Sequence, residues 1–188
     1  MLVGILALQG DYSLHAKILN DNNVGNILVR DPRQLMKVDG LIIPGGESTV
    51  VLKLLNKLNF IPALDDFSRK RCIYGSCAGA IIISSTTNDE MKTLDYIKIK
   101  SYRNFWGSQI NSFVDKVDVN FIDRPFKGYF IRAPKFKLID KKLDVLATYK
   151  NNPVLIRNNR HLVSSFHPEM TCDFSIHNYF IGMIKNEI

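Results

Sequence analysis

Four short apolar runs in the first half of the chain constrain its fold more than any other feature. The first, from Val3 to Leu8, has no charged residue and is typical of a parallel strand that is covered on both faces. The runs at residues 27–29, 41–43 and 72–74 follow at intervals that leave room for helical connections. Because parallel strands need such crossovers, the alternation predicts an α/β fold with an open, mostly parallel sheet flanked by helices.

The rest of the sequence predicts the helices and the further strands of this fold. Ser48 and Asp31 are each placed to cap a helix, and Pro32 suits a first helical position. Longer helices are expected at residues 12–20, 50–58, 78–83 and 173–185. The second half is richer in strands, with candidates at residues 96–100, 113–121, 128–132, 143–149, 153–157 and 161–166. Because no linker rich in Pro, Gly or Ser interrupts the chain, we expect residues 1–188 to form one domain.

The composition is that of an ordinary soluble globular protein, with 46% hydrophobic and 23% charged residues among 188. No apolar run approaches the roughly 20 residues that a membrane helix needs, so we expect no membrane partner. The segment Met1–Leu8 lacks a basic leader and a small-residue cleavage site. This favours a first strand over a signal peptide, and hence a cytoplasmic location.

The chain carries a formal net charge of +7, but its positive residues are dispersed. The densest groups, Arg69-Lys70-Arg71 and Lys141-Lys142, are brief and have no aromatic residues between them. We therefore expect no nucleic-acid partner, and at most a basic patch for a protein partner. The three cysteines, at positions 72, 77 and 172, form no CxxC pair, which argues against a disulfide framework or a structural zinc site.

The segment Gly75-Ser76-Cys77-Ala78-Gly79 follows the fourth apolar run and precedes an apolar helical stretch. Glycines on either side of Cys77 permit a tight turn from strand to helix, which lifts the thiol to the carboxyl edge of the sheet. The first amides of the helix favour the reactive thiolate, and the N–H of Ala78 is placed to donate to an oxyanion. We interpret Cys77 as a nucleophile; the simpler alternative is a buried cysteine in a turn.

A second candidate segment, His167-Pro168-Glu169, follows another apolar run. Pro168 favours an extended His167, and residues i and i+2 of an extended segment point to the same side. Glu169 is therefore expected to orient the imidazole, which as a base activates a thiol and later protonates the leaving amine. Alone, the motif also fits a satisfied surface histidine. A metal site lacks further ligands at suitable spacing, so we expect no metal or other cofactor.

The segment Pro44-Gly45-Gly46-Glu47-Ser48-Thr49 follows the third apolar run. Two glycines after a strand let the backbone approach a ligand and turn an N–H towards it. The N–H of Gly46 is therefore expected to be a second oxyanion donor, beside that of Ala78. The alternative is an ordinary turn that leads into a capped helix.

Taken in order, these motifs resemble the class I glutamine amidotransferases, and within them the glutaminase subunits of pyridoxal 5′-phosphate synthase. The elbow around Cys77 and the His-Pro-Glu motif are shared by many class I glutaminases. Residues 8–11 (LQGD), 45–49 (GGEST) and 131–134 (IRAP) are more specific to this family. The chain departs from the family pattern at Ser76, where threonine is usual, and after Arg103, where the residues are bulkier.

The resemblance implies a flavodoxin-like fold and hydrolysis of L-glutamine to glutamate and ammonia through a thioester. Cys77 would be the nucleophile, His167 the base and Glu169 its orienter. The residues implied to bind glutamine are Gly46, Glu47, Ser48, Arg103, Ile131 and Arg132. A guanidinium suits the α-carboxylate of glutamine because it can pair with both oxygens.

The resemblance also implies a partner, a synthase subunit of (β/α)8 type that receives the ammonia and makes pyridoxal 5′-phosphate. Such glutaminases generally need that partner for full activity. We hypothesise that the oxyanion donor near Gly45 and Gly46 is correctly oriented only in the complex.

Three alternatives remain open. A glutaminase of another amidotransferase, such as imidazole glycerol phosphate synthase, would share the elbow and His-Pro-Glu but normally lacks Gly-Gly-Glu-Ser-Thr. A catalytically silent binding module on the same fold is disfavoured by the intact Cys77, His167 and Glu169. A flavodoxin-like peptidase or stress protein usually has a histidine directly after the nucleophilic cysteine, where this chain has Ala78.

Overall fold

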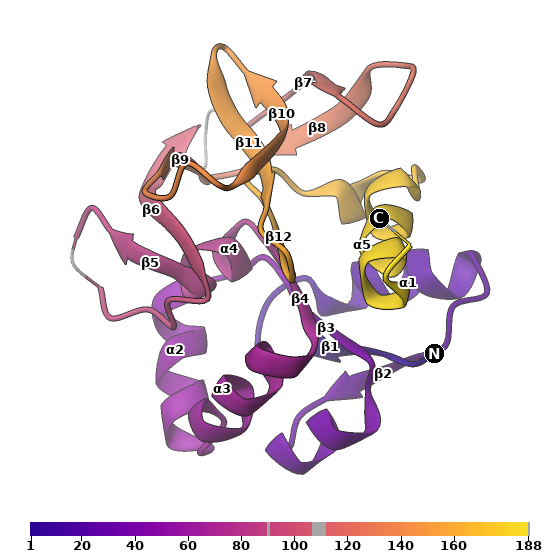
Figure 1. The fold of residues 1–188 in the computed structure, drawn as a ribbon, viewed down its shortest axis with the longest axis vertical. Coiled ribbons are helices and arrows are strands. Elements are labelled where there is room, and N and C mark those ends of the chain that lie inside the picture. Colours follow the sequence, from indigo (N-terminus) through magenta and orange to yellow (C-terminus); the bar gives the residue numbers. More distant parts are fainter. Residues whose placement is uncertain (90, 107–111, 188) are drawn as a thin grey trace.

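The computed structural model describes residues 1–89, 91–106 and 112–187 (Figure 1). Within these residues, the main sheet has nine strands in the order β2-β1-β3-β4-β12-β11-β10-β7-β8. Neighbouring strands from β2 to β12 run parallel, and the strands from β11 onward pair antiparallel. The parallel part has the 2-1-3-4 order of flavodoxin-like sheets, continued by β12. The predicted α/β fold is therefore confirmed.

Each predicted strand overlaps an observed one, but two observed strands, Ser84–Thr87 and Ala133–Leu138, lie where none was predicted. The parallel part consists of β1 (Val3–Leu6), β2 (Asn26–Val29), β3 (Gly40–Ile43), β4 (Cys72–Ser76) and β12 (His161–Ser164). The antiparallel part consists of β7 (Phe113–Val119), β8 (Phe126–Phe130), β10 (Asp144–Tyr149) and β11 (Asn152–Arg157). A smaller sheet contains β5 (Ser84–Thr87), β6 (Ile97–Trp106) and β9 (Ala133–Leu138).

Helices cover both faces of the parallel part of the sheet. On one face lie α1 (Tyr12–Asp21) and α5 (Ser175–Lys185), and on the other lie α2 (Ser48–Lys57), α3 (Ile61–Lys70) and α4 (Ala78–Ile83) (Figure 1). The short 3-10 helices are η1 (Pro32–Lys37) and η3 (Pro168–Met170). No helix of the described ranges is long and apolar enough to cross a membrane.

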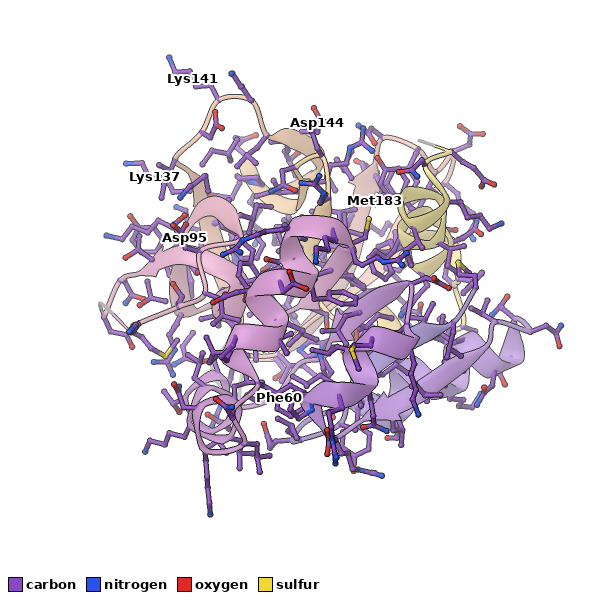
Figure 2. All side chains as sticks on the ribbon, turned by 60° about the horizontal axis from the view of Figure 1, so that its bottom comes forward. Phe60, Asp95, Lys137, Lys141, Asp144 and Met183 are labelled. Carbon is purple, nitrogen blue, oxygen red and sulfur yellow. The ribbon has the colours of Figure 1, made fainter. Side chains whose placement is uncertain are left out.

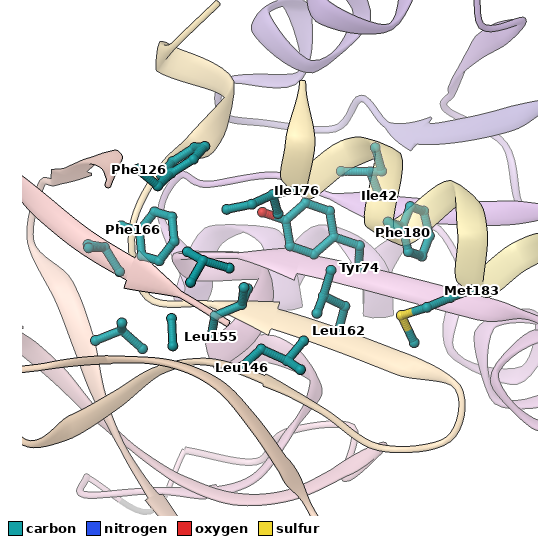
Figure 3. Packing of buried hydrophobic residues seen from close by; sticks show 14 of the residues in the cluster. Ile42, Tyr74, Phe126, Leu146, Leu155, Leu162, Phe166, Ile176, Phe180 and Met183 are labelled. Atoms are coloured by element: carbon teal, nitrogen blue, oxygen red, sulfur yellow. The ribbon is translucent and has the colours of Figure 1, made fainter. Parts of the chain in front are cut away.

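The two faces carry separate hydrophobic cores, because successive side chains of a strand point to opposite sides. In β4, Tyr74 lies in the core beneath α5, whereas Ile73 lies in the core beneath α2 and α3. Figure 3 shows Tyr74 beside Ile176 and Phe180 of α5, and the Tyr74 and Phe180 ring centroids are 5.7 Å apart. Packing on both faces fixes the position of β4, which leads directly into Cys77.

Two expectations about helix starts had different outcomes. The Asp31 side chain accepts a hydrogen bond from the backbone N–H of Arg33 and caps η1, as predicted. The expected cap at Ser48 is wrong: Ser48 is the first residue of α2, and Glu47 occupies the capping position without a side-chain hydrogen bond. The loop before α2 is instead held by a hydrogen bond from the Glu47 N–H to Gln9.

Charged side chains extend from many parts of the surface, as Figure 2 shows for Lys137, Lys141 and Asp144. Acidic partners pair with several of the basic groups, for example Lys70 with Asp66 and Arg157 with Asp144. This distribution fits the dispersed positive charge expected from the sequence.

Candidate active site

The candidate site lies where the carboxyl ends of four parallel strands meet. Segments that follow β1, β3, β4 and β12 supply Gln9, Gly46, Cys77 and His167, in that order along the chain. They line a cavity of about 250 Å³, close to the lower end of the range of about 300–1,000 Å³ for small-molecule sites. The full lining is Gln9, Gly10, Asp11, Gly46, Glu47, Ser48, Cys77, Ala78, Ile81, Arg103, Asn104, Ile131, Arg132 and His167.

This cavity brings together every site residue predicted from the sequence except Glu169, which is buried next to His167. A larger cavity of about 560 Å³ lies between η1 and α3 and contains none of the predicted site residues. It lacks a cysteine or histidine among its lining residues. Of these two cavities, the smaller is the one lined by a cysteine and a histidine.

Cys77 occupies a strained turn between β4 and α4. Its φ of 47° and ψ of −101° lie in a region that non-glycine residues rarely adopt. Its N–H donates to the Ser164 carbonyl at 2.9 Å, which ties the turn to the end of β12. The turn is tight because a Cβ at Gly79 would lie 1.9 Å from the Ile43 carbonyl oxygen. Glycine at position 79 therefore lets α4 start directly against β3.

The Cys77 thiol faces the segment after β8. Its Sγ lies 3.7 Å from the carbonyl oxygen of Ile131. The side chain is largely buried, yet it lines the cavity together with Ala78, the first residue of α4. This position gives a substrate access to the sulfur while most water is excluded.

His167 and Glu169 form a close buried pair. His167 Nδ1 lies 2.7 Å from Glu169 Oε1, and both residues are 4% exposed. The geometry differs from the extended segment expected from the sequence, because Pro168–Met170 form the 3-10 helix η3. This turn brings the Glu169 carboxylate back to His167. The hydrogen bond occupies Nδ1, so Nε2 is the ring nitrogen left for interaction with Cys77.

The charged forms of His167 and Glu169 stabilise each other. Burial alone would lower the pKa of His167, but attraction to Cys77 and Glu169 outweighs burial and raises this pKa well above its usual value. Burial alone would raise the pKa of Glu169, but attraction to neighbouring histidines and hydrogen bonds lowers it to about 2. His167 therefore holds its proton more strongly than an imidazole in water does.

The loop after β3 is fastened to the loop after β1. The Asp11 N–H donates to the Gly45 carbonyl at 3.1 Å, and the Glu47 N–H donates to Gln9 Oε1 at 2.8 Å. Gly46 lies between these two hydrogen bonds with a φ of 152°, in a region that side chains rarely allow. The backbone of the predicted oxyanion loop is therefore fixed by groups outside it.

The two arginines expected to bind substrate both line the cavity, and both already have acidic partners. Arg103 forms an ion pair with Asp89. Arg132 Nη1 lies 3.0 Å from Glu47 Oε1, and both side chains are about half exposed. An incoming carboxylate would compete with these partners.

Sequence reasoning missed several polar groups next to the proposed triad. Ser76 and His15 are fully buried and lie near the Glu169 carboxylate, with Ser76 Oγ 3.4 Å from Oε1 and His15 Nε2 3.5 Å from Oε2. A signal was present for His15, because it shares the apolar stripe of α1 with Ile18 and Leu19. A histidine on such a stripe must find a buried polar partner.

Asp11, His167 and Glu169 place possible metal ligands within 4.8 Å of one another. Nδ1 of His167 and Oε1 of Glu169 are hydrogen-bonded to each other. A metal ion that used these atoms would have to replace that hydrogen bond.

Comparisons with known proteins identify the family of the chain. The model of the SNO glutamine amidotransferase family matches residues 5–186. The pyridoxal 5′-phosphate synthase subunit PdxT of Francisella tularensis subsp. tularensis is 42% identical over 96% of this chain and 98% of its own length. The subunit of the same name from Thermosipho africanus is 40% identical over 98% of this chain and 100% of its own length.

Solved structures place the chain on the same fold. A crystal structure described as a glutamine amidotransferase superposes with a TM-score of 0.92 and 35% identity, covering 97% of this chain and 98% of that one. The structure of PurLQS from Thermotoga maritima, with a TM-score of 0.68, 16% identity and coverage of 99% of this chain and 97% of that one, shares the fold alone. The chain therefore belongs to the SNO glutamine amidotransferase family.

Proposed function

We propose that this protein hydrolyses the side-chain amide of L-glutamine with Cys77 as nucleophile, His167 as acid and base, and Glu169 as the orienter of His167. Membership of a glutamine amidotransferase family makes it a glutaminase. The observation that carries the residue assignment is that Cys77 and His167 line one cavity while Glu169 holds the other side of the imidazole.

The proposed reaction has two steps. The Cys77 thiolate attacks the amide carbon, and the protonated His167 gives its Nε2 proton to the leaving nitrogen, so that ammonia departs and a thioester remains. Water then attacks the thioester while His167 takes up its proton, which releases glutamate and restores the thiolate. The N–H groups of Gly46 and Ala78 are proposed to stabilise the oxyanion of each step.

Binding of the substrate is assigned to the rim of the cavity. Arg103 and Arg132 are proposed to pair with the α-carboxylate, and Gly46, Glu47, Ser48 and Ile131 are proposed to contact the rest of glutamine. Because Arg103 is paired with Asp89 and Arg132 with Glu47, binding exchanges an internal carboxylate for that of the substrate. Such an exchange discriminates against ligands without a carboxylate.

The ammonia supplies the synthesis of pyridoxal 5′-phosphate. Relatives that are 40–42% identical over nearly the whole chain are subunits of pyridoxal 5′-phosphate synthase, which favours this product over that of imidazole glycerol phosphate synthase. We propose a synthase subunit of (β/α)8 type as the partner and the cytoplasm as the location. We further propose that residues 1–188 form a single glutaminase domain, in keeping with the family match over residues 5–186.

The test is a glutamine hydrolysis assay with the synthase partner present. Cys77→Ala is expected to reduce kcat at least about 10⁴-fold, because it removes the nucleophile. Cys172→Ala, which changes an exposed cysteine, is the matched control and is expected to retain full activity. Substantial hydrolysis by Cys77→Ala would overturn the proposed mechanism.

A further inference from the structure

A chain of buried polar side chains continues from Glu169 away from the cavity. It consists of His15 on α1, Ser76 at the end of β4 and His177 on α5, and all three are 0% exposed. His15 Nε2 lies 3.2 Å from Ser76 Oγ and 3.5 Å from Glu169 Oε2. His15 Nδ1 lies 2.9 Å from His177 Nε2. Three elements far apart in the sequence thus meet behind the carboxylate that orients His167.

One placement of the protons on His15, Ser76 and His177 is consistent with these contacts. The single hydroxyl hydrogen of Ser76 is donated to Glu169 Oε1, so Ser76 accepts from His15, and Nε2 of His15 carries the proton. In neutral His15, Nδ1 is then an acceptor, and the proton between the two histidines belongs to His177 Nε2. His177 Nδ1, which has no partner among the described residues, is left as a bare acceptor and not as an orphaned N–H.

The opposite placement of the protons is higher in free energy. A proton on His15 Nδ1 would turn the lone pair of Nε2 towards the Glu169 carboxylate. It would also move the proton of His177 to Nδ1, where a buried N–H would lack a partner among the described residues. The hydrogen bonds therefore run in one direction, from His177 to His15, from His15 to Ser76, and from Ser76 to Glu169 Oε1 at 3.4 Å.

Burial disfavours the charged form of both outer histidines. It lowers the pKa of His15, against the opposing attraction of Glu169 and Asp11 and with the added repulsion of His167. It also lowers the pKa of His177, to about 3. His15 is thus placed to act as an oriented N–H donor to Ser76.

We propose that His15 and His177 are positioning residues for glutamine hydrolysis: His177 fixes the tautomer of His15, and His15, through Ser76, holds the Glu169 carboxylate in the orientation that binds His167. This inference rests on the proposed triad. It makes the third member of the triad the start of a longer hydrogen-bonded chain that is anchored in α1 and α5.

The first test reads the tautomers directly. The chain has only four histidines, so long-range ¹H–¹⁵N correlation spectra of the free protein at neutral pH can be assigned with four single variants. We expect the Nε2–H tautomer for His15 and His177. In His177→Leu, we expect the signal of His15 to move towards a mixture of tautomers. An Nδ1–H tautomer of His15 in the wild type would overturn the proposal, whatever the activity of the protein.

The second test measures kinetics in the presence of the synthase partner. His15→Leu removes the donor to Ser76 and is expected to lower kcat about 10- to 100-fold, the range for leaving a buried hydrogen-bond partner unsatisfied, with a change in KM of less than about threefold. His15→Gln can present an amide N–H near the position of Nε2 and is expected to recover most of the loss. His161→Leu is the matched control, because His161 is also buried but packs against Tyr96, outside this chain of hydrogen bonds.

Failure of this inference is distinguishable from failure of the proposed function. If Cys77→Ala retains hydrolysis, the triad itself is wrong. If Cys77→Ala is inactive but His15→Leu turns over glutamine as fast as His161→Leu does, only the positioning role is overturned. If His15→Leu does not fold, the tautomers of the wild-type protein still decide the matter.

Discussion

Nδ1 of His167 lies 2.7 Å from Oε1 of Glu169, although the two residues are separated by a single proline. The 3-10 turn that starts at Pro168 folds the carboxylate back onto the ring and buries both groups. The pair follows the end of β12, and His167 lines the same cavity as Cys77. One ring nitrogen is thus held by the carboxylate, and the other is the one that we propose for proton transfer.

Glu169→Gln is expected to keep the shape of the site and remove the charge that orients His167. An amide can donate as well as accept, so the tautomer of the imidazole is no longer fixed. We expect kcat to fall about 10³- to 10⁴-fold, the scale seen when the acidic member of a triad is replaced. Steady-state glutamine hydrolysis measures this. Glu187→Gln, an exposed change in an ion pair with Lys185, is the control and should leave kcat unchanged.

Cys77→Ala is expected to lower the pKa of His167. In the wild type, attraction to Cys77 and Glu169 outweighs the burial that by itself lowers this pKa. Removing the sulfur leaves burial in place and takes away part of the attraction, so the imidazolium loses its proton at lower pH. A pH titration of the His167 ring protons by NMR measures the shift. An unchanged pKa would show that the two side chains do not interact.

Arg103→Ala is expected to raise KM for glutamine about 10- to 100-fold and to change kcat much less. The reason is loss of a charge-assisted hydrogen bond to the α-carboxylate, which is bound equally in the ground state and the transition state. Arg33→Ala, which breaks the exposed ion pair with Asp31 far from the cavity, serves as the control. Equal KM values for the two variants would show that Arg103 does not bind glutamine.

Gly79→Ala is expected to destabilise the protein by at least about 3 kcal/mol, because the new Cβ would lie 1.9 Å from the backbone oxygen of Ile43. Gly25→Ala is the matched control: its Cβ would meet Met1 at 3.4 Å, an ordinary contact. Urea unfolding of both variants measures the difference in the free energy of unfolding. A stable Gly79→Ala variant would mean that α4 can move away from β3.

Much of the fold could be predicted because its parallel strands are buried on both faces. Such strands read as continuous apolar runs, and each of the four runs in the first half became a strand. The helix α3 was missed although Ile61, Leu64 and Phe67 recur at helical spacing, because the helix is only 10 residues long and has a proline in its first turn. The short strand β5 was missed because its sequence, Ser-Ser-Thr-Thr, is polar and its pairing with β6 is decided by tertiary context.

Site residues that stand in short local motifs could be predicted from the sequence. Those that depend on contacts with side chains distant in the sequence could not. Cys77 and His167 stand in short motifs whose spacing carries a physical meaning, and the structure brings them to one cavity. Asp89 as the partner of Arg103 depends on how two strands of the smaller sheet pair, which no local pattern encodes. The same holds for His15 and His177, which meet only because α1 and α5 pack on the same face of the sheet.

The central claim is tested most directly by trapping the nucleophile. Incubation with a glutamine analogue that carries a chloroketone in place of the side-chain amide, followed by peptide mapping, identifies the cysteine that attacks this position. We predict one adduct per chain at Cys77, in step with loss of hydrolysis and slowed by added glutamine. Loss of hydrolysis with the adduct on Cys172 or Cys72, or full hydrolysis by protein modified at Cys77, would contradict the account.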